Sequence, residues 1–189
     1  FYFFLRFFPN IYCVDLKAGM NQLLNPAKYY KNWKQIYEER DKYLFLKAGS
    51  FPHEKERIGP GPQILKTQKG WLFIYHATGE VCTNVSKVYG LTEKIKRAYS
   101  ISAALLDLEN PKEVLCRTKH PIYIPSLPHE LSGNDQYPVD IPGVIFPTGA
   151  IIRKEKLLLY CGAGDKYMIL LSCNLDSLVN YLIQYCSLG

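Results

Sequence analysis

The stretch Trp71-Leu72-Phe73-Ile74-Tyr75-His76 decides the fold class, because it has the pattern of an apolar β-strand that ends in a histidine. A glycine-proline segment, Ile58-Gly59-Pro60-Gly61-Pro62, precedes it, and a Gln68-Lys69-Gly70 turn leads into it. Successive side chains of a strand point to opposite faces. The alternation therefore gives two faces, one with Leu72, Ile74 and His76 and the other with Trp71, Phe73 and Tyr75. A titratable side chain at the end of an apolar face suits a ligand contact, and it equally suits a histidine buried in a core.

The composition is that of a globular protein, with 48% hydrophobic and 21% charged residues among 189. This length predicts a single domain over residues 1–189. The net charge of +6 is mild and the basic residues are spread along the chain, which argues against a nucleic-acid partner and suits a small anionic ligand. The 15 tyrosines and 9 phenylalanines favour strands, and such rings also stack on the apolar faces of sugars.

The six cysteines form no Cys-x-x-Cys pair and no zinc-like spacing with histidine, so we predict neither a metal site nor another cofactor. Most lie in apolar runs, which indicates reduced thiols of a cytoplasmic protein, although an even number also allows disulfides. The apolar residues 1–8 are too short to cross a bilayer, and Arg6 within them argues against a signal peptide. No membrane partner is expected. A strand that begins in mid-sheet fits better and predicts a chain without its N-terminal portion.

The remaining pattern predicts an all-β protein. Turn signals separate ten predicted strands, at residues 1–8, 11–16, 62–67, 71–77, 98–107, 113–118, 143–146, 149–153, 156–161 and 167–173. Short strands with Gly/Pro corners indicate a sandwich, a barrel or a propeller, and a weak echo between residues 70–77 and 156–163 favours a propeller. Residues 26–43 resemble a loop or a short helix. Residues 175–186 have helical spacing after Asn174, a good N-cap.

Six motifs follow one another in a fixed order. They are Arg57-Ile-Gly-Pro-Gly-Pro, Gly70-Trp-Leu-Phe-Ile-Tyr-His, Tyr99-Ser-Ile-Ser-Ala-Ala-Leu-Leu-Asp-Leu-Glu-Asn-Pro, Glu130-Leu-Ser-Gly, Val144-Ile-Phe-Pro-Thr-Gly and Tyr160-Cys-Gly-Ala-Gly-Asp165. Together they closely resemble glycoside hydrolase family 130, the β-mannoside phosphorylases and related mannosidases. The resemblance runs from Arg57 to about Leu182. Before it, Phe4-Leu-Arg6-Phe-Phe-Pro-Asn-Ile resembles, more loosely, the family's strand that carries an arginine before a proline-containing turn. It implies a five-bladed β-propeller, of which this chain would be an incomplete, C-terminal portion of about three blades with a C-terminal helix.

The resemblance also implies an enzyme that cleaves β-1,4-mannosides with inorganic phosphate as co-substrate, giving mannose 1-phosphate with inversion; some relatives use water instead. Its site residues, carried over by motif, are Arg6, Arg57, His76 and Tyr99 for phosphate, and Asp165 with His76 for the sugar. Arginine suits this task because its planar fork holds a tetrahedral dianion, and a histidine can donate a bond and add charge if protonated. The family usually has lysine where Arg57 stands. Glu130 matches a family glutamate near the site, and a catalytic role for it is left open.

Departures from the family pattern leave alternatives. The family's general-acid aspartate lies in N-terminal blades, and no residue of this chain matches it, although glycoside cleavage needs a proton donor. Gln63 replaces a usual proline, and Cys161 a usual aromatic residue. The chain could therefore be a phosphorylase, a β-mannoside hydrolase of the same family, a non-catalytic fragment with a half-site, or a scaffold for protein partners. An open propeller edge further predicts homo-oligomers or poor solubility.

Each candidate residue also has a purely structural interpretation. Arg6 could pair with an acidic neighbour, Arg57 could be a surface charge, and Tyr99 could serve in packing. Asp165 could cap a tight turn, where aspartate is favoured. Glu130 could be a solvated carboxylate of a loop. The contacts of these side chains decide between the two interpretations.

Overall fold

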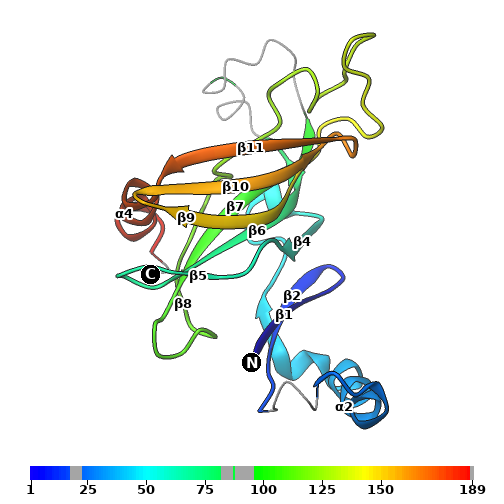
Figure 1. Cartoon of the computed structure of the whole chain (residues 1–189), viewed down its shortest axis with the longest axis vertical. Helices are drawn as coiled ribbons and strands as arrows, with labels where there is room; N and C mark the ends of the chain where they lie inside the picture. The colour runs from blue at the N-terminus through cyan, green and yellow to red at the C-terminus, as the bar shows by residue number, and fades with distance from the viewer. Residues whose placement is uncertain (18–22, 82–86, 88–95, 188–189) are drawn as a thin grey trace.

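The computed structural model describes residues 1–17, 23–81, 87 and 96–187, and these form a mostly β structure with a few helices (Figure 1). The first antiparallel sheet contains β1 (Tyr2–Phe7), β2 (Asn10–Asp15) and β3 (Leu44–Leu46). The middle sheet contains β4 (Arg57–Pro60), β5 (Leu65–Lys66), β6 (Trp71–Glu80), β7 (Arg97–Leu106) and β8 (Val114–Arg117). The third contains β9 (Ile145–Arg153), β10 (Lys156–Ala163) and β11 (Tyr167–Asn174). The helical segments are α2 (Pro26–Glu38), α4 (Leu175–Tyr185) and the 3-10 turns η1 (Arg40–Tyr43) and η2 (Pro52–Glu54).

The middle sheet is the centre of the molecule, because both of its faces are buried. The β6–β7 pair runs without interruption from Trp71 opposite Leu106 to Glu80 opposite Arg97. Leu72 and Ile74 belong to a core shared with β9, β10 and α4. The opposite face of β6 enters a second core shared with the first sheet. The two faces predicted from the alternation of β6 are therefore confirmed.

The glycine-proline segment suggests a corner before β6, but most of it lies in the strand β4, whose placement matters for the site. It pairs with β6 from Arg57 opposite Thr78 to Pro60 opposite Tyr75. The predicted strand at 62–67 shrinks to Leu65–Lys66, since Pro62 cannot donate a ladder hydrogen bond.

A further prediction about strands needs correction. The strands predicted at 143–146 and 149–153 are one strand, β9, in which an irregularity of register opposite Tyr160 and Cys161 accommodates Pro147. Of the two alternatives for residues 26–43, a loop or a short helix, the structure has the helix: α2 covers 13 residues, and η1 follows it.

The C-terminal helix is confirmed. Asn174 accepts a hydrogen bond from the Ser177 backbone N–H at 2.8 Å and so caps α4, whose Val179 and Leu182 enter the core between the middle and third sheets. In the part of the chain that the structure describes, no helix is both long and apolar enough to cross a membrane.

Candidate functional site

Four of the predicted site residues come from neighbouring strands of the first and the middle sheet, and their cluster lies on the face of the middle sheet that is turned toward β9. Arg6 lies on β1, Arg57 on β4, His76 on β6 and Tyr99 on β7. Thr78 pairs with Arg57 on one side and with Tyr99 on the other. Since directly opposed residues of neighbouring strands share a face, Arg57, Thr78 and Tyr99 form a row across three strands. His76, two residues before Thr78, lies on the same face, opposite Gly59.

Gly59 supports this cluster because it lacks a side chain. A Cβ atom placed there would lie 2.3 Å from Cε1 of His76 and 2.8 Å from Cδ of Arg6. The histidine ring and the stem of Arg6 therefore both lie directly against the backbone of β4. The β1–β2 turn is attached at the same place, since the Ile58 N–H donates to the Pro9 carbonyl at 2.9 Å. The backbone thus brings Arg6 to the cluster.

The two arginines are not neutralised. The Arg57 guanidinium carbon lies 4.9 Å from the centre of the Tyr99 ring and 5.9 Å from that of Phe8. Within the described residues, neither Arg6 nor Arg57 forms an ion pair or a side-chain hydrogen bond; the observed ion pairs use other cations. Arg6 is exposed and Arg57 is half-buried. Two guanidinium groups free of carboxylates leave this surface ready for an anion.

His76 is buried and neutral. Only 1% of its surface is exposed, and its ring centre lies 4.2 Å from that of Phe146 on β9. Burial, followed by the charges of Arg6 and Arg57, lowers the pKa of His76 to about 3. A backbone group of Pro60 opposes this with a smaller effect. The histidine therefore adds no charge at neutral pH, and it serves the cluster as a donor at one nitrogen and an acceptor at the other.

Unpaired buried polar atoms gather in this cluster. Among the described residues, the buried side-chain atoms without a well-formed hydrogen bond are Arg57 Nε, both ring nitrogens of His76 and Thr78 Oγ1. Buried polar groups are normally paired, so a group of exceptions in one place indicates a polar ligand or water that completes it. Thr78 was not predicted as a site residue. The signal that could have found it is its position two residues after His76, on the same strand face.

Asp165 lies apart from the arginines, on the turn between β10 and β11. It is exposed and has a φ of 51°, a conformation that aspartate tolerates better than most residues. Backbone bonds link this turn to the strand of Tyr99: the Gly164 N–H donates to Val144, and the Tyr99 N–H donates to Gly143. No described contact joins the Asp165 carboxylate to Arg6, Arg57 or His76. Its role as a sugar contact stays a prediction.

Glu130 is fixed in a loop. Its carboxylate is fully buried and accepts hydrogen bonds from the Tyr123 hydroxyl and from the backbone N–H groups of Ser126 and Leu127, at 2.7–3.0 Å. Its backbone carbonyl accepts from Gly143 and Val144. Glu130 therefore orders the segment that reaches Tyr99. A catalytic role for Glu130 stays a prediction. The interpretation of Glu130 as a solvated loop carboxylate is wrong, because its carboxylate is buried.

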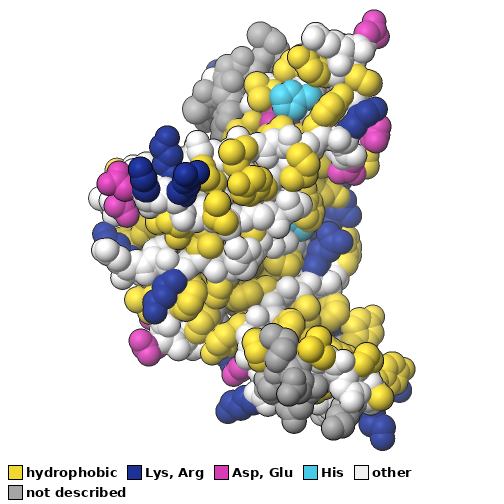
Figure 2. Space-filling view, viewed as in Figure 1, with side chains coloured by type: hydrophobic (Ala, Val, Ile, Leu, Met, Phe, Trp, Pro, Cys, Tyr) yellow, Lys and Arg dark blue, Asp and Glu magenta, His cyan; other side chains and the backbone are white. Residues whose placement is uncertain are grey.

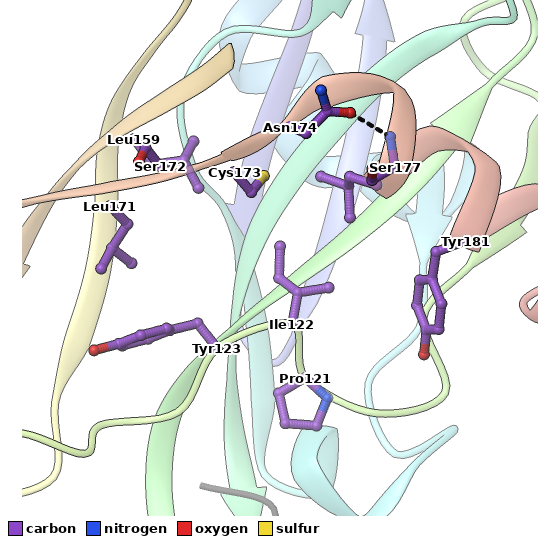
Figure 3. Close-up of a pocket in the computed structure, with 11 residues that line it drawn as sticks. Pro121, Ile122, Tyr123, Leu159, Leu171, Ser172, Cys173, Asn174, Ser177 and Tyr181 are labelled. Atoms are coloured by element: carbon purple, nitrogen blue, oxygen red, sulfur yellow. Dashed lines mark hydrogen bonds between the residues drawn. The ribbon is translucent and has the colours of Figure 1, made fainter. Parts of the chain in front are cut away.

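A pocket lies apart from this cluster, between β10, β11, α4 and residues 121–123 (Figure 3). Its volume is about 500 Å³. The lining residues are all uncharged: Pro121, Ile122, Tyr123, Leu159, Leu171, Ser172, Cys173, Asn174, Ser177, Leu178 and Tyr181. None of the predicted site residues is among them, and without cations the pocket does not suit phosphate. The described residues also contain no group of three His, Cys, Asp or Glu side chains that could hold a metal ion.

Comparisons with known proteins identify the family of this chain. The family model described as beta-1,4-mannooligosaccharide phosphorylase matches residues 22–184. A 1,2-beta-oligomannan phosphorylase of Thermoanaerobacter sp. is 32% identical over 135 residues, which cover 71% of this chain and 36% of that protein. A beta-1,4-mannooligosaccharide phosphorylase of Ruminococcus albus is 26% identical over 136 residues, which cover 71% of this chain and 35% of that protein.

The fold has solved relatives as well. The structure of a beta-1,2-mannobiose phosphorylase from Listeria innocua, in complex with beta-1,2-mannobiose, superposes with a TM-score of 0.59 and 28% identity, covering 74% of this chain and 34% of that one. The chain thus spans about a third of the length of the relatives it matches. Because the family model covers most of its residues, the chain belongs to glycoside hydrolase family 130.

Proposed function

We propose that this chain supplies the phosphate-binding part of an enzyme that cleaves β-mannosides by phosphorolysis. The observation that carries the proposal is the pair of arginines without an ion-pair partner, Arg6 and Arg57, beside a buried histidine whose ring nitrogens form no well-aligned hydrogen bond. The relatives are named for both β-1,2 and β-1,4 mannosides, so the proposal extends to β-mannosides as a class.

Phosphorolysis places two requirements on this cluster. Phosphate must be held as a dianion, and one of its oxygens must be left free to attack the anomeric carbon of the sugar. Two guanidinium groups supply charge-assisted donors for the other oxygens. Neutral His76 can donate a further hydrogen bond to phosphate or accept one from a sugar hydroxyl. Holding the nucleophile in place lowers the entropic part of the barrier. No catalytic residue is identified in this chain.

The arginine pair favours phosphorolysis over hydrolysis. Water is a neutral nucleophile, and a site built for it has no need of two free cations. The hydrolase therefore remains the second candidate.

Within this proposal, the three sheets are consecutive blades of a five-bladed propeller, since each packs face to face on the next through a core. We also retain the cytoplasmic location, which agrees with the free thiols of the described Cys13, Cys116, Cys161, Cys173 and Cys186.

The test replaces Arg57 by alanine and measures phosphate affinity by calorimetry. We expect a loss of about 1.5–3 kcal/mol, the contribution of hydrogen bonds to a charged group. Arg153→Ala is the matched control, because Arg153 is an exposed arginine at the end of β9. An Arg57→Ala variant that binds phosphate as tightly as the unchanged chain would remove Arg57 from the site.

A second assay separates a turning-over enzyme from a fragment that only binds. The chain is incubated with β-1,4-mannobiose and phosphate, and mannose 1-phosphate is measured. Phosphate binding without product supports a non-catalytic fragment with a half-site. This alternative is considered because no residue of this chain matches the family's general acid. Product formation that needs no phosphate, with free mannose released, supports the hydrolase.

A further inference from the structure

We propose that Phe8, to which the family resemblance assigns no role, is a platform on which a sugar ring stacks beside the bound anion. The inference rests on the proposed function and adds to it the residue that holds the apolar face of the mannoside. Phe8 lies between β1 and β2, two residues after Arg6.

The position of Phe8 is fixed by its neighbours. The following residue, Pro9, accepts the hydrogen bond from Ile58 of β4, so the turn is tied to the strand that carries Arg57. The Arg57 guanidinium lies 5.9 Å from the centre of the Phe8 ring and 4.9 Å from that of the Tyr99 ring. Phe8 thus borders Arg57, one of the two cations that we expect to hold phosphate, and follows the other, Arg6, by two residues.

The ring is open to solvent. Phe8 is 70% exposed, whereas its neighbour Phe7 packs against Tyr12 and Tyr37 with ring centres 5.3 Å apart in each pair. Phe8 contacts no other aromatic ring of the described residues. Exposing so large an apolar side chain contributes nothing to the core. Exposed apolar side chains are common on protein surfaces, so it is this exposure together with the position beside Arg57 that points to a ligand contact.

The ligand chemistry follows from this combination. An open aromatic face next to two guanidinium groups suits a molecule with an apolar ring face and an anion close to it. A mannose ring offers C–H groups on one face, and phosphate attacking its anomeric carbon places the anion within one bond of that ring. A free anion would use the arginines and leave Phe8 untouched, so sugar and phosphate affinities should respond differently to changes at this position.

The experiment uses the full 189-residue chain, with inorganic phosphate and β-1,4-mannobiose as separate probes and together. Calorimetry gives the two affinities, and saturation-transfer NMR reports which sugar protons lie against an aromatic ring. We expect Phe8→Ala to weaken mannobiose binding about tenfold and to leave phosphate affinity within about twofold. Phe8→Trp should restore the sugar affinity. Tyr185→Ala, which removes a ring of 66% exposure on α4, is the matched control and should change neither affinity.

Several results would overturn the inference. Mannobiose affinity unchanged in Phe8→Ala would exclude stacking. An equal loss of phosphate affinity would show that Phe8 shields Arg57 instead. Reduced self-association with unchanged sugar binding would identify a protein contact. If the unchanged chain binds phosphate and no mannobiose, the platform is excluded while the phosphate site stands; if it binds neither, the proposed function falls as well.

Discussion

At the scale of single residues, Gly59 determines whether the cluster can form. Its missing side chain is the space in which the His76 ring and the Arg6 stem lie. Gly59→Ala should destabilise the fold by about 1–3 kcal/mol, the usual cost of overpacking, and should weaken phosphate binding as His76 is displaced. Urea unfolding and calorimetry measure the two effects.

Gly162 provides the control for this prediction. It also lies in a strand, β10, and a Cβ atom there would meet nothing within 4 Å. Gly162→Ala should leave stability and phosphate affinity close to those of the unchanged chain. If both alanine variants unfold at the same urea concentration as that chain, the close packing at Gly59 is not what holds His76.

The residues of the site differ in how far the sequence reveals them. His76 could be placed because strand alternation fixes its face, and Arg57 because its motif is local. The alternation also places Thr78 on the face of His76, but it does not show that Thr78 lacks a partner, and no local pattern indicates Phe8. Whether a hydroxyl lacks a partner, or a ring is exposed, depends on neighbours from other strands. The neutrality of His76 also depends on Arg6, which lies far away in sequence.

At the scale of elements, a buried ion pair joins β8 to η2. Arg117 Nη2 lies 2.6 Å from Glu54 Oε2, and the Tyr75 hydroxyl donates to the other Glu54 oxygen at 2.6 Å. Arg117→Met should destabilise the fold by about 3–5 kcal/mol, because it leaves a buried carboxylate without its cation. Thermal or urea unfolding measures this loss.

A surface ion pair with the same distance between its charged atoms serves as the control. Lys55 and Glu80 lie 2.6 Å apart at the surface, with both side chains exposed. Lys55→Met should therefore destabilise the fold far less than Arg117→Met does. Similar losses in the two variants would mean that burial does not set the energy of the Arg117–Glu54 pair.

Prediction of the elements succeeded where the pattern was local. The faces of β6 follow from a period of two, and the start of α4 follows from Asn174. It failed where a residue type suggests more than one conformation. The prolines near β4 and within β9 indicated corners, but edge positions and irregular register tolerate proline inside a sheet.

At the scale of the whole molecule, the outer face of the third sheet is apolar and open. It carries Ile151, Tyr160, Met168 and Leu170, which are 41–67% exposed. Figure 2 shows hydrophobic side chains over this sheet, with Lys and Arg side chains toward one end. We expect the chain to self-associate through this face at high concentration.

Light scattering tests this expectation. Replacing Met168 and Leu170 by lysine should shift the chain toward monomer, whereas Tyr185→Lys, an exposed apolar position on α4, should not. A monodisperse monomer of the unchanged chain at high concentration would contradict the prediction.

The middle sheet has a separate core on each side, and this arrangement affects which part of the protein unfolds locally. The first sheet packs through one core only, so it can detach while the other core keeps the middle and third sheets together. Detachment would carry Arg6 away and leave His76 in contact with Phe146. An anion held by Arg6 and Arg57 would bridge the first and the middle sheet, and its binding free energy would oppose their separation. Slower hydrogen exchange in β1 and β2 when phosphate is present would then show that phosphate binding keeps the first sheet attached to the middle sheet.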